Sequence, residues 1–262
     1  VAGMKAIADN FTKYTPGNGI LELRQEIVKK LKEDNGVEYA LNEVTTAVGA
    51  KQAIASTMMV IAGPGDEVLL PIPCWVSYTE MIRLAGATPV FVPVREDNYE
   101  LDLDAIEQAI TPRTKAIIIC TPNNPTGAVY SEESLRKLAA LAVAHDFFIV
   151  ADEIYEKLVY DGAKHFSVAS ISQEVKDRTV TVNGFSKAYA MTGWRIGYAA
   201  ARADVVKGIM AVQSQTTSAT SAISQKAAVE ALRGPQHDLE VMVEEFKRRK
   251  DYVVDRLNKI PG

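Results

Sequence analysis

Short apolar runs rich in β-branched residues alternate with amphipathic segments along most of the chain. Several runs, such as Ala116–Cys120 and Phe148–Ala151, are apolar at consecutive positions, as expected where helices cover both faces of a sheet. We therefore predict an α/β fold with a seven-stranded, mostly parallel sheet and helices on both faces, followed by helices. The predicted strands lie at 44–48, 67–70, 88–94, 115–120, 147–151, 179–182 and 196–201. The predicted helices lie at 21–33, 52–62, 75–84, 103–110, 131–145, 204–213, 219–233 and 239–258.

The two ends of the chain lack this alternation. Tyr14–Gly19 is rich in proline, glycine and asparagine and predicts a loop before the first helix. After the last strand the pattern is helical only. We predict three parts: an N-terminal arm or loop at 1–18, a large domain at 19–235 and the start of a connecting helix at 236–262.

Composition and charge exclude several classes of function. With 29 Lys and Arg against 33 Asp and Glu, the net charge of −4 provides no basic surface for nucleic acid. The longest apolar runs are shorter than the roughly 20 residues of a membrane span, so no membrane partner is expected. Two cysteines that are not arranged as a Cys-x-x-Cys pair, and an N-terminus without a leader pattern, predict a reducing compartment, the cytoplasm. Three scattered histidines predict no metal site.

The candidate binding residues come directly after the predicted strands, because ligands of open α/β sheets bind beyond the carboxyl ends of the strands. Gly49, Ala50 and Lys51 follow the first strand and enter a helix, where backbone N–H groups and the helix dipole can hold a phosphate. Neither a Walker motif nor a Gly-x-Gly-x-x-Gly motif is present. Trp75 and Asn124 lie in turn-rich segments after the second and fourth strands, where a purely structural role would also suit them.

Two later strand ends carry charged groups. Asp152 follows the fifth strand, where a buried carboxylate needs a cationic partner. Lys187 follows the sixth strand, with Arg195 eight residues further on. Taken singly, such a lysine is usually a surface residue. Together the three supply an amine for a Schiff base, a carboxylate for a protonated ring nitrogen and a guanidinium for a phosphate. Pyridoxal 5'-phosphate requires all three groups.

Four segments carry a resemblance to a known family. The sequence Asn183–Gly197, with Pro122–Gly127, Ala151–Tyr155 and Tyr14–Gly19, resembles the class I/II aminotransferases, and especially the bacterial aspartate aminotransferases. The resemblance implies pyridoxal-phosphate-dependent transfer of an amino group between an amino acid and a 2-oxo acid. It implies that Lys187 forms the internal aldimine and then carries the proton between Cα and C4′.

The remaining roles are also implied by the resemblance. Asp152 would pair with the pyridine nitrogen, Tyr155 and Asn124 would contact the ring O3′, and Trp75 would stack on the ring. The phosphate would be held by Arg195 and by the backbone of Gly49, Ala50 and Lys51.

Further residues bear on assembly, phosphate binding and substrate choice. Tyr14 resembles the tyrosine that reaches the phosphate of the neighbouring subunit, which implies a homodimer with shared sites. Gly184 stands where the family often has a small polar residue, so one phosphate hydrogen bond is not expected. Lys51 also stands where bacterial relatives use a lysine towards the distal carboxylate, which favours aspartate or another acidic donor.

Other readings of the same residues stay open. Family members have an N-terminal segment that closes over the site and a small domain whose arginine binds the substrate α-carboxylate. The sequence contains neither, so we expect a truncated chain with impaired turnover. The same cofactor contacts serve C–S or C–C lyases and synthases, and they also occur in non-catalytic regulatory modules. A fragment that folds without function is a further alternative.

Overall fold

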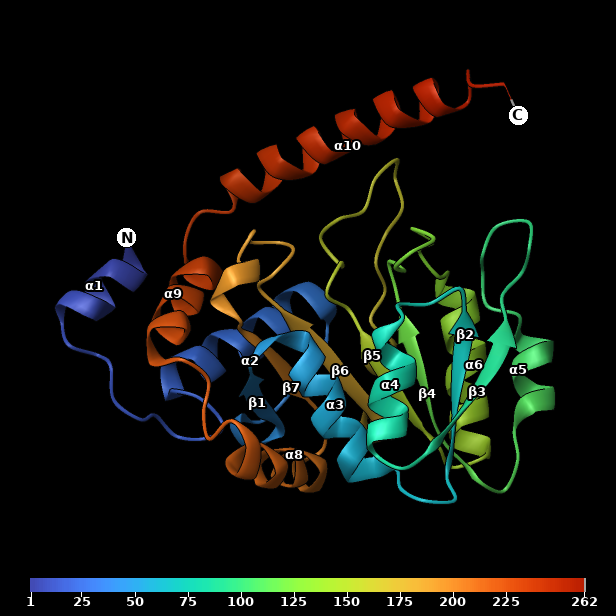
Figure 1. Ribbon diagram of the computed structural model, residues 1–262, viewed down its shortest axis with the longest axis horizontal. Helices are drawn as coiled ribbons and strands as arrows, with labels where there is room; N and C mark the ends of the chain where they lie inside the picture. Colours follow the sequence, from blue (N-terminus) through green and yellow to red (C-terminus); the bar gives the residue numbers. More distant parts are fainter. Residues whose placement is uncertain (262) are drawn as a thin grey trace.

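The structure is a computed structural model and describes residues 1–261. Seven strands form one sheet in the order β1-β7-β6-β5-β4-β2-β3 (Figure 1). β7 runs antiparallel to both of its neighbours, and the other pairs are parallel. The predicted seven-stranded, mostly parallel sheet is confirmed. The strands are β1 (Val44–Ala47), β2 (Glu67–Ile72), β3 (Thr88–Pro93), β4 (Thr114–Cys120), β5 (Phe148–Asp152), β6 (Thr179–Gly184) and β7 (Gly197–Ala200).

Helices connect the strands and follow the last of them. Each predicted helix is present, with boundaries that differ by a few residues. The α-helices are α1 (Ala2–Ala8), α2 (Leu21–Asn35), α3 (Gly49–Ile61), α4 (Ser77–Leu84), α5 (Leu103–Ala109), α6 (Glu132–Ala144), α7 (Gln173–Arg178), α8 (Ala203–Thr216), α9 (Ala222–Arg233) and α10 (His237–Leu257). Short 3₁₀ turns occur at Leu41–Glu43, Val168–Ser170 and Thr192–Trp194.

The sheet is buried on both faces, which explains the consecutive apolar positions of its central strands. In β4, Ile118 packs into a core with α3, α4 and α8, whereas Ile117 and Ile119 pack into a second core with α5 and α6. A third core joins α2 and α9 to β1 and β7. Removing this apolar surface from water on both sides is the main stabilising contribution to the sheet.

Parallel pairing brings the carboxyl ends of the central strands to one edge. Cys120 of β4 pairs with Asp152 of β5, and Asp152 pairs with Val182 of β6. The segments that carry Asn124, Tyr155 and Lys187 therefore leave the sheet at the same edge.

Two helices were not predicted, and α10 stands apart from the core. The predicted arm at 1–18 contains α1, and α7 is a six-residue helix in which only Val175 is buried. None of the residues of α10 is buried, and the helix runs along one side of the molecule, at the top of Figure 1. Its Lys247 and Lys250 form ion pairs with Asp161.

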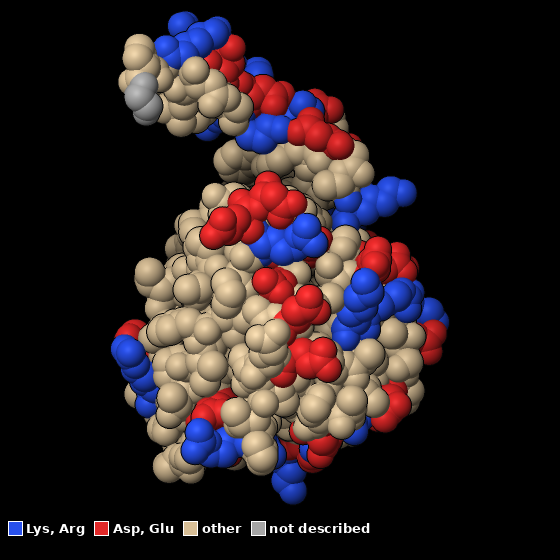
Figure 2. Space-filling model, turned by 90° about the vertical axis from the view of Figure 1, so that its right-hand side faces the viewer, with Lys and Arg blue, Asp and Glu red and all other residues tan. Residues whose placement is uncertain are grey.

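The surface charges, the apolar character of the helices and the state of the cysteines bear on the possible partners and surroundings of the chain. Acidic and basic side chains are interspersed on the face seen in Figure 2. Among residues 1–261, no helix combines the length and the apolar character that crossing a bilayer requires. Cys74 and Cys120 are both free thiols.

Candidate active site

A cavity of about 280 Å³ lies beyond the carboxyl ends of β1, β4, β5 and β6. This volume is near the lower end of the range for small-ligand sites. Eight predicted site residues line it: Ala50, Lys51, Trp75, Asn124, Asp152, Tyr155, Lys187 and Arg195. Four lining residues were not predicted: Tyr78, Ile154, Ser186 and Thr192.

One end of the cavity is built to hold an anion. α3 begins at Gly49 and has no side-chain cap, and Ala50 and Lys51 of its first turn line the cavity, so the N–H groups of this turn are available to a ligand. The positive end of the helix dipole lies there as well. Arg195 adds a guanidinium whose Nη1 donates to the Thr192 carbonyl at 2.7 Å, and Ser186 adds a hydroxyl. Backbone amides, a guanidinium and a hydroxyl together suit a phosphate.

Gly49 is required for this arrangement. Its φ of +80° lies in the left-handed region, and a Cβ there would lie 2.4 Å from Nη2 of Arg195. Any other residue would strain the backbone and displace the guanidinium. Gly49 has no side chain that could line the cavity, but its lack of a Cβ leaves the space that the Arg195 guanidinium occupies.

Two further glycines allow close approach of the elements around this end. A Cβ on Gly197 of β7 would lie 2.7 Å from the backbone nitrogen of Ala50, so glycine lets the start of α3 lie against the sheet. A Cβ on Gly184 would lie 2.9 Å from Cα of Gly197. The absence of a polar side chain at Gly184 therefore has a steric reason, and Ser186 is the serine that lines the cavity.

The opposite end of the cavity carries one buried carboxylate. Asp152 is 3% exposed, and its Oδ2 accepts a hydrogen bond of 2.7 Å from the hydroxyl of Tyr78. Its Oδ1 accepts one of 3.1 Å from the backbone N–H of Ile154. Burial raises the pKa of Asp152 to about 6, against the effect of these two donors. A buried carboxylate of this kind favours a cationic partner, because its charge is poorly solvated.

Aromatic rings and two lysines fill the space between the ends. Nζ of Lys51 lies 4.8 Å from the ring centroid of Trp75, and Nζ of Lys187 lies 5.5 Å from that of Tyr155. The Asn124 amide donates to the Tyr155 hydroxyl at 3.4 Å. Lys187 follows β6, which lies in the sheet between β5, the strand of Asp152, and β7, the strand that Arg195 precedes. The segment of this primary amine therefore leaves the sheet between those of the buried carboxylate and of the guanidinium.

Tyr14 is placed outside this cavity. Its side chain is 93% exposed, and it borders a separate groove with Ala219 and Ile223. None of the other predicted site residues borders that groove. Larger grooves of about 570 and 540 Å³ run beside α10, but neither contains Lys187, Asp152 or Arg195.

The unpredicted lining residues had partial signals in the sequence. Tyr78 follows Trp75 by three residues, one helical turn, and its ring packs edge-on against Trp75 with centroids 5.3 Å apart. Ser186 directly precedes Lys187. The hydrogen bond from Tyr78 to Asp152 joins residues 74 positions apart, which periodicity cannot show.

Comparisons with known proteins agree with the fold. The family model described as aminotransferase class I and II matches residues 2–262. An aspartate aminotransferase of Bacillus sp. (strain YM-2) is 46% identical over the whole chain, which spans 67% of that relative. The crystal structure of the aspartate aminotransferase from Rhizobium meliloti superposes with a TM-score of 0.97 at 43% identity, over all of this chain and 66% of that one.

A second solved structure carries a different description. The aromatic aminotransferase from Pyrococcus horikoshii OT3 superposes with a TM-score of 0.96 at 39% identity, over 98% of this chain and 70% of that one. The chain thus spans about two thirds of the length of the relatives it matches. With a family model over nearly its whole length and relatives above 40% identity, the chain belongs to the class I and II aminotransferases and is an enzyme of that family.

Proposed function

We propose that the chain binds pyridoxal phosphate in this cavity and transfers an amino group from an acidic amino acid, such as aspartate, to a 2-oxo acid. The class I and II aminotransferases generally depend on this cofactor. The observation that carries the proposal is the placing of Asp152, Lys187 and Arg195 around one cavity at the start of α3. The donor set fits the cofactor, with anion ligands, a carboxylate and an amine around one cavity.

The residues at the two ends would bind and orient the cofactor. Arg195, Ser186 and the first-turn N–H groups of α3 would hold the phosphate. Asp152 would keep a proton on the ring nitrogen, because the buried carboxylate would stabilise the positive charge of the protonated nitrogen by forming an ion pair with it. When bound, pyridoxal phosphate supplies an aldehyde group, with which a primary amine can condense, and a ring that withdraws electrons from the substrate Cα.

The residues between the ends would position the ring and move the proton. Trp75 would stack on the ring, and Asn124 and Tyr155 would contact its O3′. The Lys187 amine would hold the cofactor through its aldehyde group and, as a base, would move the proton at the substrate Cα.

Three features of the molecule support the proposed domains, the proposed oligomeric state and the proposed location. Residues 19–235 contain every lining residue and form the proposed cofactor-binding domain. Residues 236–262, of which Gly262 lies outside the described residues, form the proposed start of a connecting helix. The 93% exposure of Tyr14 fits a proposed homodimer in which that side chain reaches the site of the partner. The two free thiols are consistent with the proposed cytoplasmic location.

Product analysis tests the proposed reaction. With aspartate, 2-oxoglutarate and saturating cofactor, we expect stoichiometric oxaloacetate and glutamate, measured by chromatography. Alanine and carbon dioxide from aspartate, without glutamate, would instead indicate a C–C lyase. Cofactor binding without any product would favour a regulatory module.

Replacing Gly49 with alanine is expected to weaken cofactor binding at least about tenfold, because the new Cβ must displace the Arg195 guanidinium and strain the backbone. The measurement is a titration of cofactor-free protein with pyridoxal phosphate, followed by absorbance. Gly63→Ala is the matched control, since nothing lies within 4 Å of a Cβ there. Equal affinities for the two variants would contradict the assignment of the phosphate end.

Replacing Lys51 with glutamine is expected to lower kcat/KM for aspartate about 10- to 100-fold and to change it little for alanine, because a charge-assisted hydrogen bond to the distal carboxylate is lost. Lys207→Gln, on an exposed face of α8, is the control. A uniform loss for both substrates would show that Lys51 does not select acidic donors.

A further inference from the structure

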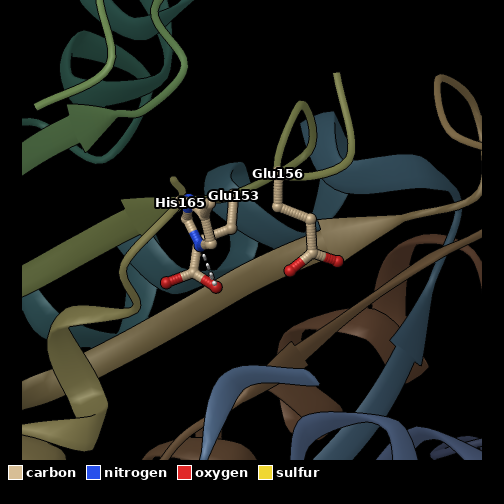
Figure 3. Close-up of side chains that lie close together, drawn as sticks. All are labelled: Glu153, Glu156 and His165. Atoms are coloured by element: carbon tan, nitrogen blue, oxygen red, sulfur yellow. Dashed lines mark ion pairs between the residues drawn. The ribbon is translucent and has the colours of Figure 1, made fainter. Parts of the chain in front are cut away.

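A buried polar cluster lies behind the turn that carries Asp152. Glu153 and Glu156 are only 1% and 7% exposed, and the side chain of His165 is 9% exposed (Figure 3). None of the three lines the cavity described above. Two carboxylates this deeply buried need specific partners, because burial of an unpaired charge is strongly unfavourable.

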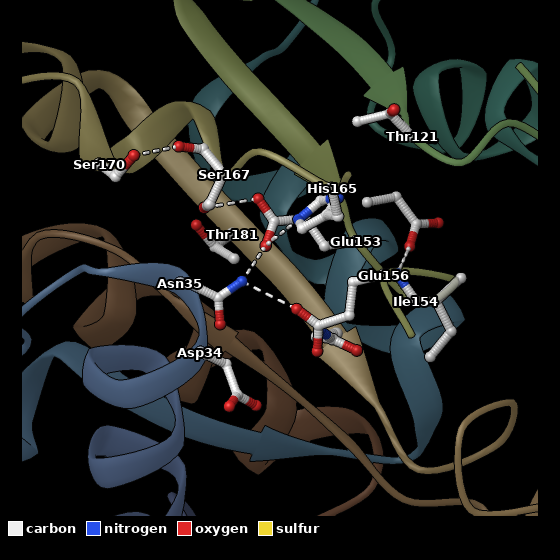
Figure 4. Close-up of polar contacts among 12 residues, drawn as sticks. Asp34, Asn35, Thr121, Glu153, Ile154, Glu156, His165, Ser167, Ser170 and Thr181 are labelled. Carbon is white, nitrogen blue, oxygen red and sulfur yellow. Dashed lines mark hydrogen bonds and ion pairs between the residues drawn. The ribbon is translucent and has the colours of Figure 1, made fainter. Parts of the chain in front are cut away.

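The partners come from a helix far away in the sequence. The side-chain amide of Asn35, the last residue of α2, donates to Oε2 of Glu153 at 3.1 Å and to Oε2 of Glu156 at 2.8 Å (Figure 4). Oε1 of Glu153 accepts from the Ser167 hydroxyl at 2.7 Å. Lys30, about one turn earlier on α2, pairs with Oε1 of Glu156 and also donates to Oδ1, the side-chain amide oxygen of Asn35, at 2.7 Å.

The cluster contains a cation, Lys30, and an imidazole, His165, which carries a charge when it is protonated. Burial raises the pKa of Glu156, but Lys30 and the Asn35 hydrogen bond outweigh it, so the net shift is downward. Burial lowers the pKa of His165, and Glu153, 3.3 Å from its Nε2, more than offsets that effect. Each of the four carboxylate oxygens of Glu153 and Glu156 has a donor or a cation, so these residues favour a structural network over a metal site.

The same short turn faces both the cluster and the cavity. Asp152 and Tyr155 line the cavity, whereas Glu153 and Glu156 face α2. Two hydrogen bonds from backbone N–H groups close the turn: Ile154 N–H donates to the side-chain Oδ1 of Asp152, and Glu156 N–H donates to the Glu153 backbone carbonyl at 2.9 Å. Holding residues 153 and 156 from behind therefore fixes residues 152 and 155 in front.

We propose that Asn35 is a positioning residue, which ties Glu153 and Glu156 to α2 and thereby holds Asp152 and Tyr155 towards the cofactor. This proposal rests on the proposed function for the roles of Asp152 and Tyr155. The tie itself is a property of the chain and exists without the cofactor. Asn35 acts through the turn and does not touch the cavity.

Amide hydrogen exchange of the cofactor-free chain tests the tie. We expect Asn35→Ala to raise the exchange rates of the Ile154 and Glu156 amides about tenfold, because two buried carboxylates lose a shared donor. The amides of β4 should keep their rates. Lys29→Ala is the control, since Lys29 lies on the exposed side of the same helix. If Asn35→Ala does not fold, Ser167→Ala removes one donor from Glu153 and should raise the same two rates about threefold.

The absorption spectrum of the bound cofactor distinguishes positioning from a general loss of stability. With pyridoxal phosphate bound, Asn35→Ala should shift the visible band in the same direction as Asp152→Asn, and Lys29→Ala should not. Unchanged exchange at Ile154, or faster exchange spread evenly over the sheet, would overturn the proposal. If exchange rises locally while Asp152→Asn leaves the spectrum unaltered, the tie stands and the proposed role of Asp152 fails.

Discussion

Replacing Lys187 with alanine is expected to abolish covalent attachment of pyridoxal phosphate and to lower the rate of amino transfer by about 10⁴-fold. Lys187 lines the cavity together with Asp152 and Arg195, and no other primary amine but that of Lys51 lines it among the described residues. The side chain is half-buried and makes no hydrogen bond in residues 1–261, so its loss should leave the fold intact. Dialysis measures the attachment of the cofactor, absorbance measures the rate of amino transfer, and circular dichroism measures whether the fold is intact.

Lys51→Ala is the matched control for this experiment. It removes the other lysine of the cavity, and the cofactor should still attach covalently to Lys187. If Lys187→Ala retained a covalently bound cofactor after dialysis and Lys51→Ala lost it, the two lysines would have to exchange roles.

Replacing Asp152 with asparagine should preserve cofactor binding but slow the half-reaction with an amino acid by about 10²- to 10³-fold. A neutral amide cannot stabilise the positive charge of a protonated ring nitrogen, so the ring withdraws electrons less effectively. Burial raises the pKa of Asp152 to about 6 in the cofactor-free chain, so an uncharged group of the same shape suits the folded state. Stopped-flow absorbance measures the half-reaction.

A matched variant separates the charge of Asp152 from its hydrogen bond. Tyr78→Phe removes the donor to Oδ2 and keeps the carboxylate. We expect it to slow the half-reaction far less than Asp152→Asn does. A half-reaction of Asp152→Asn as fast as that of the unchanged chain would remove Asp152 from the proposed mechanism.

The regular part of the fold was predictable because its signals are local. Runs such as Ala116–Cys120 are apolar on both sides of the strand, and the amphipathic spacing of Leu23, Ile27 and Leu31 marks the buried face of α2. α7 has six residues and a single buried side chain, so it has no periodic pattern to detect. β7 lies between β1 and β6 and runs antiparallel to both. This pairing joins segments far apart in the sequence, so the periodicity of the sequence cannot predict it.

Much of the candidate site was predictable for a different reason. Asp152 and Lys187 interrupt or directly follow buried strands, and parallel strands bring such ends together. The second layer was not predictable in this way. Asn35 and Glu153 are 118 residues apart, and Tyr78 reaches Asp152 across 74 residues. These contacts depend on how helices pack on the sheet.

Borohydride reduction followed by peptide mapping tests the central claim most directly. Reduction fixes the bond between the cofactor and the amine that holds it, and mass spectrometry then locates the modified lysine. The account predicts one modified residue, Lys187. Modification of Lys51 or of an exposed lysine, or no modification at saturating pyridoxal phosphate, would contradict it.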